Sequence, residues 1–255
     1  MLRNAVVCLV LLVAVCQAAP SASAIGKKLG LCSRQTPDLD VCLKKRLQFV
    51  LPDIFRNGFP ELDLEPSDPA YIRELSAKYL NGNWSANIVT KNTKTWGLSR
   101  ILIHNVRTQI QDTKHFHAEI DFTIPTIMTE GDYKLESTLL GIPINTKGFF
   151  NISMINITGT YDVTGVHINK GGEDYVKIQK VDMLPYVGDM KVYASNLIPG
   201  NEELSQAAIT FFNQNWRFVY QELLPVVNEA WSKYMADAAN LIFLRVPFKE
   251  LFPEA

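Results

Sequence analysis

The sequence predicts an α+β fold in which a long C-terminal helix covers an antiparallel β-sheet. Between about residues 87 and 197, apolar and polar residues alternate with the period of two that is typical of half-buried strands. The strand-like runs follow one another through short connections, which antiparallel pairing allows and parallel pairing does not. From residue 201 to about 244 apolar residues recur at helical spacing, which indicates a helix with an apolar face.

The N-terminus resembles a secretory signal peptide in its residue pattern. Arg3 supplies a positive charge, the stretch 6–15 is apolar, and small residues follow, with Ala18 and Ala24 as alternative cleavage points. No later stretch of about 18 uncharged apolar residues occurs, so no membrane span is expected. We therefore expect a signal peptide at 1–18, with cleavage as late as 24, and a secreted, extracellular protein whose residues 25–255 form a single domain.

Two cysteines remain after removal of that segment, Cys32 and Cys42. The secretory route is oxidising, so a disulfide between them is the first expectation. A metal pair or a catalytic thiol is the alternative, but neither cysteine has a nearby histidine or a second cysteine pair to support it.

The mature chain begins with helix and then turns. Residues 38–50 place apolar side chains at helical spacing, and the basic cluster 44–46 lies off that stripe. A solvated helix face explains the cluster better than attraction to an anionic membrane does. The stretch 52–69 is rich in proline and glycine and predicts extended structure with turns.

The clearest strand is 116–124, where Phe116, Ile120 and Phe122 lie on the apolar side. Turn-forming residues at 130–132, 145–148 and 171–172 separate several of the predicted strands. Strands of this length predict a sheet that curls or is covered on its apolar face. The full set of predicted strands is 98–110, 116–124, 133–140, 149–158, 161–168, 175–183 and 190–195.

The C-terminal pattern predicts a single helix with Asn201 as its N-cap. Its first half has an apolar stripe that includes Phe211 and Phe218, and its second half has another that includes Trp231. The two stripes are rotated by about 120° from each other at 100° per residue. Pro225 lies between them and is where a kink is expected. Two short helices are the alternative, but no glycine or turn cluster separates the halves.

Several classes of function find no support in the sequence. The net charge is -1, without the basic excess that is typical of nucleic-acid binding. No G-x-S-x-G, H-E-x-x-H, P-loop or G-x-G-x-x-G motif occurs, so no catalytic residue and no cofactor is predicted. His115 and His117 share a strand face, but no third ligand has a defined place beside them, so no metal site is predicted.

Three N-x-[ST] sequences are candidate glycosylation sites, at Asn83, Asn151 and Asn156. Asn83 lies in a polar, turn-like stretch. Asn151 and Asn156 are five residues apart in one strand-like run, so regular alternation places them on opposite faces. Both can be modified only if a bulge or turn intervenes.

A set of short stretches extends in order along nearly the whole mature chain. They are the Cys32/Cys42 pair, 51–54, 58–61, 66–69, the run 139–161 (LLGIPINTKGFFNISMINITGTY), 211–216 (FFNQNW), 222–225 (ELLP), and the tail 243–247 with 251–253. Each motif is loose by itself, but in this order and spacing the set resembles the insect takeout and juvenile-hormone-binding protein family.

The resemblance implies a long C-terminal helix wrapped by a highly curved antiparallel sheet, as in tubular lipid-binding proteins. It further implies a non-catalytic carrier with an apolar tunnel for a long hydrophobic molecule such as a fatty acid, a terpenoid or a juvenile-hormone-like compound. Members are linked to circadian, feeding and chemosensory physiology. This mature chain lacks cysteines for the second disulfide that is usual in the haemolymph hormone carriers, and Asn145 stands where members often have glycine. The missing cysteines favour the takeout-like branch.

Within the implied tunnel, the helix is expected to supply the wall. The candidate residues are Phe211, Phe218, Val219, Val226, Trp231 and Tyr234. The expected partner is a hydrophobic small molecule, and the sequence identifies no receptor. Two other classes of protein remain open, a secreted lipid-directed hydrolase and an extracellular interaction protein without a ligand.

Overall fold

The computed structural model describes residue 29 and residues 32–81, 84–111, 114–139 and 142–254. The predicted signal peptide, its alternative cleavage point at 24 and Asn83 lie outside the described residues. The strands form one seven-stranded sheet, and its antiparallel pairing is the one that the sequence predicts. They are β1 (Ala70–Asn81), β2 (Trp84–Trp96), β3 (Leu102–Gln109), β4 (His115–Leu139), β5 (Ile142–Lys170), β6 (Glu173–Met183) and β7 (Tyr186–Ala194).

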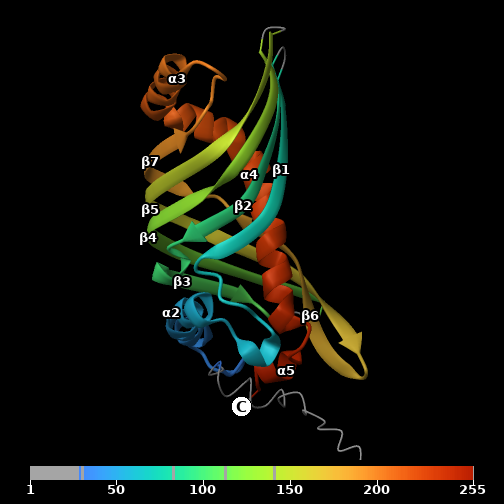
Figure 1. Ribbon diagram of the computed structural model, residues 1–255. Coiled ribbons are helices and arrows are strands. Elements are labelled where there is room, and N and C mark those ends of the chain that lie inside the picture. Colours follow the sequence, from blue (N-terminus) through green and yellow to red (C-terminus); the bar gives the residue numbers. More distant parts are fainter. Residues whose placement is uncertain (1–28, 30–31, 82–83, 112–113, 140–141, 255) are drawn as a thin grey trace, which may run out of the picture.

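The helices lie against this curled sheet. Figure 1 shows α4 running along the molecule, from α3 near one end to α5 at the other, with α2 near the α5 end. The mixed α+β fold with a curled antiparallel sheet is therefore confirmed. The helical elements are α2 (Leu39–Asn57), α3 (Glu202–Gln214), α4 (Trp216–Phe243), α5 (Phe248–Leu251) and the 3-10 turns η1 (Pro60–Leu62) and η2 (Leu98–Arg100).

The two longest strands, β4 and β5, divide the sheet into two halves. β4 pairs with β3 through its first part and with β2 through its second, while β5 pairs first with β7 and then with β6. We call β1, β2, β7, residues 128–139 and residues 142–158 the α3 half. We call β3, β6, residues 115–123 and residues 161–170 the α5 half.

The boundary between the halves is a row of irregular residues. Ile124 and Ile127 are both buried although they are three apart in β4, so the side-chain alternation reverses between them. Opposite, Asn156 in β5 has a φ of 52°, and Pro125 and Asn156 drop out of the β4–β5 pairing together. Because both strands shift at the same place, the pairing on either side keeps its register.

Two predicted turns are wrong, because the glycines in them serve close backbone packing within strands. Gly131 lies inside β4, and a Cβ there would stand 2.9 Å from the Lys91 carbonyl oxygen. Gly148 lies inside β5, where a Cβ would stand 2.3 Å from the Ser195 carbonyl oxygen. Glycine in a strand interior often marks such an approach. The third predicted turn, at Gly171 and Gly172, is confirmed and joins β5 to β6.

The predicted single C-terminal helix is also wrong, since it breaks into α3 and α4 at Asn215. This residue has φ -117° and ψ 21°, and its side-chain amide donates to the Phe211 carbonyl oxygen at 2.8 Å. Asparagine side chains compete in this way with the backbone hydrogen bonds of a helix. Pro225, where a kink is predicted, lies within the continuous helix α4.

The N-terminal part of the mature chain contains more regular structure than the sequence predicts. α2 continues through Pro52 to Asn57, and it buries Leu39 and Ile54. β1 begins at Ala70, in a stretch whose charged residues gave no clear alternation. The predicted disulfide between Cys32 and Cys42 is present, and it links the chain before α2 to the first turn of that helix.

Helix side chains close the edges of the sheet. On β6, the Asn240 amide accepts from the Ile178 N–H at 2.9 Å and donates to the Ile178 carbonyl oxygen at 2.8 Å. On β7, the Asn213 amide makes the same two contacts with Val192, at 2.8 Å and 2.9 Å. Gln48 of α2 bridges the Ile103 N–H and the Ile101 carbonyl oxygen beside β3. Each amide thus takes the place of a neighbouring strand.

We predict that Asn240→Ala lowers the free energy of unfolding by about 2 kcal/mol, because it leaves one backbone donor and one acceptor of β6 unpaired beside α4. Urea unfolding followed by circular dichroism measures the loss. Lys233→Ala, an exposed change on the same helix, serves as the control and should stay within about 0.5 kcal/mol of wild type. Equal effects from the two variants would contradict the edge-closing role of Asn240.

Candidate ligand-binding site

The interior of the α5 half is filled by protein side chains. Phe116 packs edge-on against Phe243 of α4 at 5.3 Å between ring centroids, and it also contacts Phe252. The remaining strands of this half contribute buried side chains, among them Ile103, Val106, Val176, Ile178 and Val181. These side chains form one continuous cluster with those of the helices, as in an ordinary close-packed core.

The α3 half differs in degree: Tyr133, Val187 and Met190 are buried on the same face of its strands, but several other apolar side chains there are only half-buried. Leu135 of β4 and Phe150, Ile152 and Met154 of β5 belong to this set. A Cβ at Gly131 would point to this same face, because it would stand 3.1 Å from the ring of Phe150. An apolar face that protein atoms cover incompletely is the kind of surface that binds apolar ligands. We take this lining, together with the facing part of α4, as the candidate site.

The facing stripe of α4 follows helical spacing through Leu224, Asn228, Trp231 and Met235, all of which are half-buried. Tyr161 of β5 faces this stripe from the boundary of the α5 half, where it stacks on Phe122 at 4.4 Å. Burial raises the pKa of Tyr161 to about 12, and the neighbouring Trp231 side chain partly opposes that rise. The hydroxyl therefore stays neutral at physiological pH.

Phe211 and Phe218 do not face inward as predicted, since they are 65% and 67% exposed. In α3 the buried residues are Ser205 and Ile209, which lie on a different face from Phe211 of the predicted stripe. Hydrogen bonds fix this rotation: the Ser205 hydroxyl accepts from the Ile198 N–H at 2.9 Å, and Asn213 must reach the edge of β7. Polar contacts, rather than the apolar periodicity, decide which face of α3 is inward.

The other predicted wall residues are placed differently. Val219 is half-buried, and Trp231 and Tyr234 are half-buried with their rings stacked at 5.4 Å. The side chain of Val226 lies outside the described part of the structure. Sequence reasoning missed Asn228 and Tyr161. Asn228 could have been noticed as a polar residue within an apolar stripe, whereas the position of Tyr161 depends on the pairing of β5.

Two further grooves on the protein surface are open to solvent and carry charged side chains. One is an open, shallow groove along α3, where the apolar side chains of Ala207 and Phe211 lie beside Glu202, Glu203 and Gln206. The other lies between β6 and α4 and includes Lys177, Glu229, Lys233 and Asp237 among its lining residues. Charged and polar side chains of this kind favour solvent over hydrocarbon.

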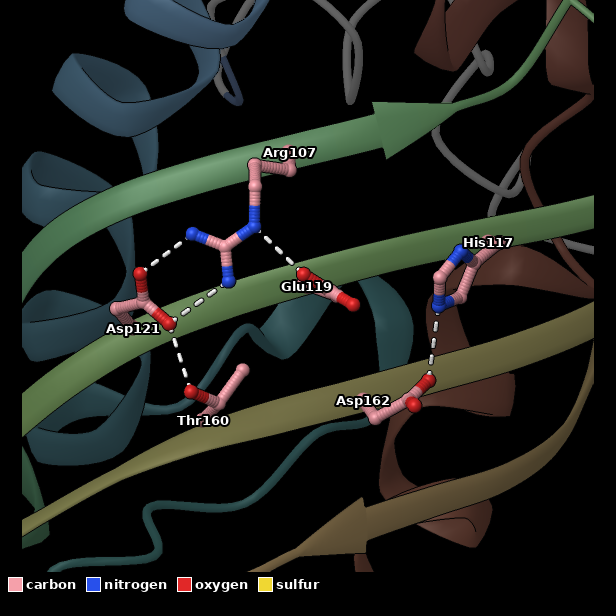
Figure 2. A network of polar contacts seen from close by, with 6 residues as sticks. All are labelled: Arg107, His117, Glu119, Asp121, Thr160 and Asp162. Carbon is pink, nitrogen blue, oxygen red and sulfur yellow. Dashed lines mark hydrogen bonds and ion pairs between the residues drawn. The ribbon is translucent and has the colours of Figure 1, made fainter.

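A polar network covers part of β3, β4 and β5 (Figure 2). Arg107 contacts Glu119 at 2.5 Å and Asp121 at 2.6 Å, and Thr160 donates to Asp121 at 2.7 Å. The Arg107 guanidinium, followed by the Thr160 hydroxyl, lowers the pKa of Asp121 to about 2. The network therefore holds a charged carboxylate on the sheet.

The sequence placed no further metal ligand beside His117, but the structure brings two carboxylates near it. His117, Glu119 and Asp162 bring ligand atoms within 4.8 Å of one another. These side chains already have partners, because His117 contacts Asp162 at 3.0 Å and Glu119 contacts Arg107 (Figure 2). The cluster is accounted for by hydrogen bonds and ion pairs within the protein.

The two described glycosylation candidates lie on an irregular strand. Asn156 is exposed, and Asn151 is half-buried in the same strand. The reversal of alternation at Asn156 places it on the same side as Asn151, instead of on the opposite faces that regular alternation would give. The intervening irregularity that double modification requires is thus present.

The fold and the lined interior define a class of protein, the binders of hydrophobic small molecules. The model of the haemolymph juvenile hormone binding protein family matches residues 8–253, and the chain belongs to this family. Among the described residues, no helix is both long and apolar enough to cross a membrane.

Individual relatives agree with this assignment. The crystal structure of Epiphyas postvittana Takeout 1 superposes with a TM-score of 0.70 at 26% identity, over 84% of this chain and 96% of that one. The circadian clock-controlled protein daywake of Drosophila yakuba is 24% identical over 204 residues, 78% of each chain. A Schistocerca gregaria protein named "Putative beta-carotene-binding protein" is 24% identical over 220 residues, covering 86% of this chain and 85% of its own.

We predict that the Asp121 network stabilises the protein only when that carboxyl is ionised. Its pKa is lower in the folded state, so its contribution is complete above about pH 4 and disappears as the pH falls towards 2. Asp121→Asn should therefore lower the free energy of unfolding by about 1 kcal/mol at neutral pH, allowing for solvent screening. Urea unfolding at neutral pH and near pH 2 measures the difference.

Near pH 2 the variant and the wild type should converge. Asp237→Asn, an exposed carboxylate on α4, provides the matched control and should show no comparable convergence. A deficit in Asp121→Asn that remains constant across this pH range would refute the ionised pairing.

Proposed function

We propose that this protein is a secreted carrier for a long hydrophobic small molecule of the fatty-acid, terpenoid or juvenile-hormone-like type. The observation that carries the proposal is the set of half-buried apolar side chains in the α3 half, beside an α5 half whose inward apolar side chains are mostly buried. Family membership and the name of the Schistocerca gregaria relative support binding of a hydrophobic ligand. The carrier role involves no catalytic residue, cofactor, nucleic acid or membrane span.

Secretion and physiology belong to the same proposal. The N-terminal pattern at 1–18, with cleavage as late as 24, supports export of a single carrier domain comprising 25–255. The disulfide between Cys32 and Cys42 is typical of proteins that fold in an oxidising compartment. A role in circadian physiology is supported by the name of the clock-controlled daywake relative. The feeding and chemosensory alternatives follow only from the resemblance to the takeout family.

The energetics favour a moderate affinity. Each methylene removed from water contributes about 0.8 kcal/mol, so a chain of about fifteen carbons offers about 12 kcal/mol before losses. Association costs about 4–15 kcal/mol in lost freedom, which leaves affinities nearer micromolar than picomolar. Related apolar chains are expected to compete for the same interior.

We predict that Ile152→Asp weakens ligand binding at least about tenfold, because it introduces a charge into the apolar lining. Displacement of a fluorescent naphthylamine probe by a long-chain fatty acid measures the affinity, and thermal unfolding checks that the variant is folded. Phe218→Asp is the matched control on an exposed side chain and should bind as wild type does. Weakening by Phe218→Asp alone would move the site to the outer face of α4.

Organic extraction of the natively purified protein, followed by mass spectrometry, tests the carrier role directly. A retained lipid is the expected result. An empty extract together with no binding of any fatty acid, terpenoid or similar lipid would reject the carrier role in favour of a ligandless interaction protein. Ester hydrolysis that is lost on replacement of one serine or histidine would instead identify a hydrolase.

We predict that protein secreted from insect cells carries glycans on Asn83, Asn151 and Asn156, because the strand irregularity leaves Asn151 and Asn156 on one side. Intact-mass measurement before and after treatment with a glycosidase gives the number of occupied sites. Single substitutions of each asparagine by glutamine assign them. Occupancy of Asn151 or Asn156 but never both would indicate that β5 is a regular strand in solution.

A further inference from the structure

The interior contains two buried polar atoms on α4 that lack a hydrogen-bond partner in the part of the chain that the structure describes. They are the indole Nε1 of Trp231, whose interaction with the nearby Tyr161 hydroxyl does not reach hydrogen-bond geometry, and the amide Oδ1 of Asn228. Buried polar atoms in native proteins are nearly always hydrogen-bonded, since an unpaired one loses its interaction with water without replacement. Two such atoms, one helical turn apart within an apolar stripe, are placed to receive a polar group of a bound molecule.

Their position is the inner end of the candidate site. Asn228 and Trp231 belong to the inward stripe of α4, and Trp231 packs against the buried core. Tyr161, which neighbours Trp231, is 7% exposed and stacks on Phe122 of the filled α5 half. Residues 224–228 continue from this point towards α3. A chain lying along the α3 half would thus have one end at this polar group.

We propose that Trp231 and Asn228 bind the polar end group of the carried molecule, and that this end group is a neutral hydroxyl, as in a long-chain primary alcohol or terpenoid alcohol. The inference rests on the proposed carrier function and specifies its ligand class. The apolar lining then accommodates the chain, while the two polar side chains fix its direction and select its terminus.

The donor and acceptor pattern selects the hydroxyl. An indole Nε1–H can only donate, and the unpaired Oδ1 of Asn228 can only accept. A hydroxyl accepts from the first and donates to the second. An ether, ester or ketone oxygen can pair with Trp231 but leaves Asn228 unpaired. A carboxylate has no proton to donate at neutral pH and carries a charge that is costly to bury.

The test compares three ligands of equal chain length in the probe-displacement measurement: a primary alcohol, its methyl ether and the alkane. Asn228→Leu keeps the side-chain volume and removes the acceptor, so it should weaken binding of the alcohol about three- to tenfold and leave the ether unchanged. Trp231→Phe keeps an aromatic ring and removes the donor, so it should weaken the alcohol and the ether by similar factors. Affinity for the alkane should stay within about twofold in both variants.

Trp216→Phe is the matched control, since it makes the same chemical change at another tryptophan of α4 and should preserve the relative affinities of the three ligands. Thermal unfolding verifies that each variant is folded. Equal loss for all three ligands in the variants, or no loss for the alcohol, would overturn the polar end site while leaving the carrier function intact. Failure of the wild type to bind any of the three, or any other lipid, would reject the carrier function itself.

Discussion

The structure depends on how the free edges of a strongly curled sheet are satisfied. An open antiparallel sheet exposes unpaired N–H and C=O groups along its outer strands, and these groups must find partners wherever a helix covers them. Asn240, Asn213 and Gln48 each provide one donor and one acceptor to a backbone edge. α4 can therefore lie along β6 without leaving the backbone unpaired, and α3 can lie along β7 in the same way.

The same contacts explain why apolar periodicity is an incomplete guide to helix orientation. In α3 the position of Asn213 against β7 and the burial of the Ser205 hydroxyl rotate the helix, so that Phe211 faces outward. In α4 the Asn240 contact and the Ser232 contact with the Val181 N–H orient the helix on β6. Trp231 and Asn228 are then presented to the interior on the adjoining face. The site is a consequence of how the edges are closed.

The irregular row at Pro125 and Asn156 gives the protein two halves with different interiors. The side-chain alternation of β4 and β5 reverses at this row. Both strands therefore keep apolar side chains on the inward face in each half of the sheet. The α5 half joins α2, α4 and α5 in a filled core that supplies stability. The α3 half retains an apolar lining that protein atoms cover only partly. The α5 half can therefore stabilise the fold, while the α3 half supplies the apolar interior.

The sequence by itself determined the fold class, the antiparallel pairing, the Cys32–Cys42 bridge and the family, because alternation, composition and local motifs are properties of short stretches. It placed Trp231 on an inward stripe for the same reason. Only the tertiary structure decided that Gly131 and Gly148 lie within strands, that the helix breaks at Asn215, and that Phe218 faces outward. The glycine positions and the orientation of α3 depend on contacts with residues far away in the chain, such as Ser195 with Gly148 and Val192 with Asn213. The break at Asn215 instead involves a local hydrogen bond to Phe211 that the apolar periodicity does not report. Long-range contacts leave no periodic pattern in the sequence, and so the direction of a helix face becomes visible only when its partners are in place.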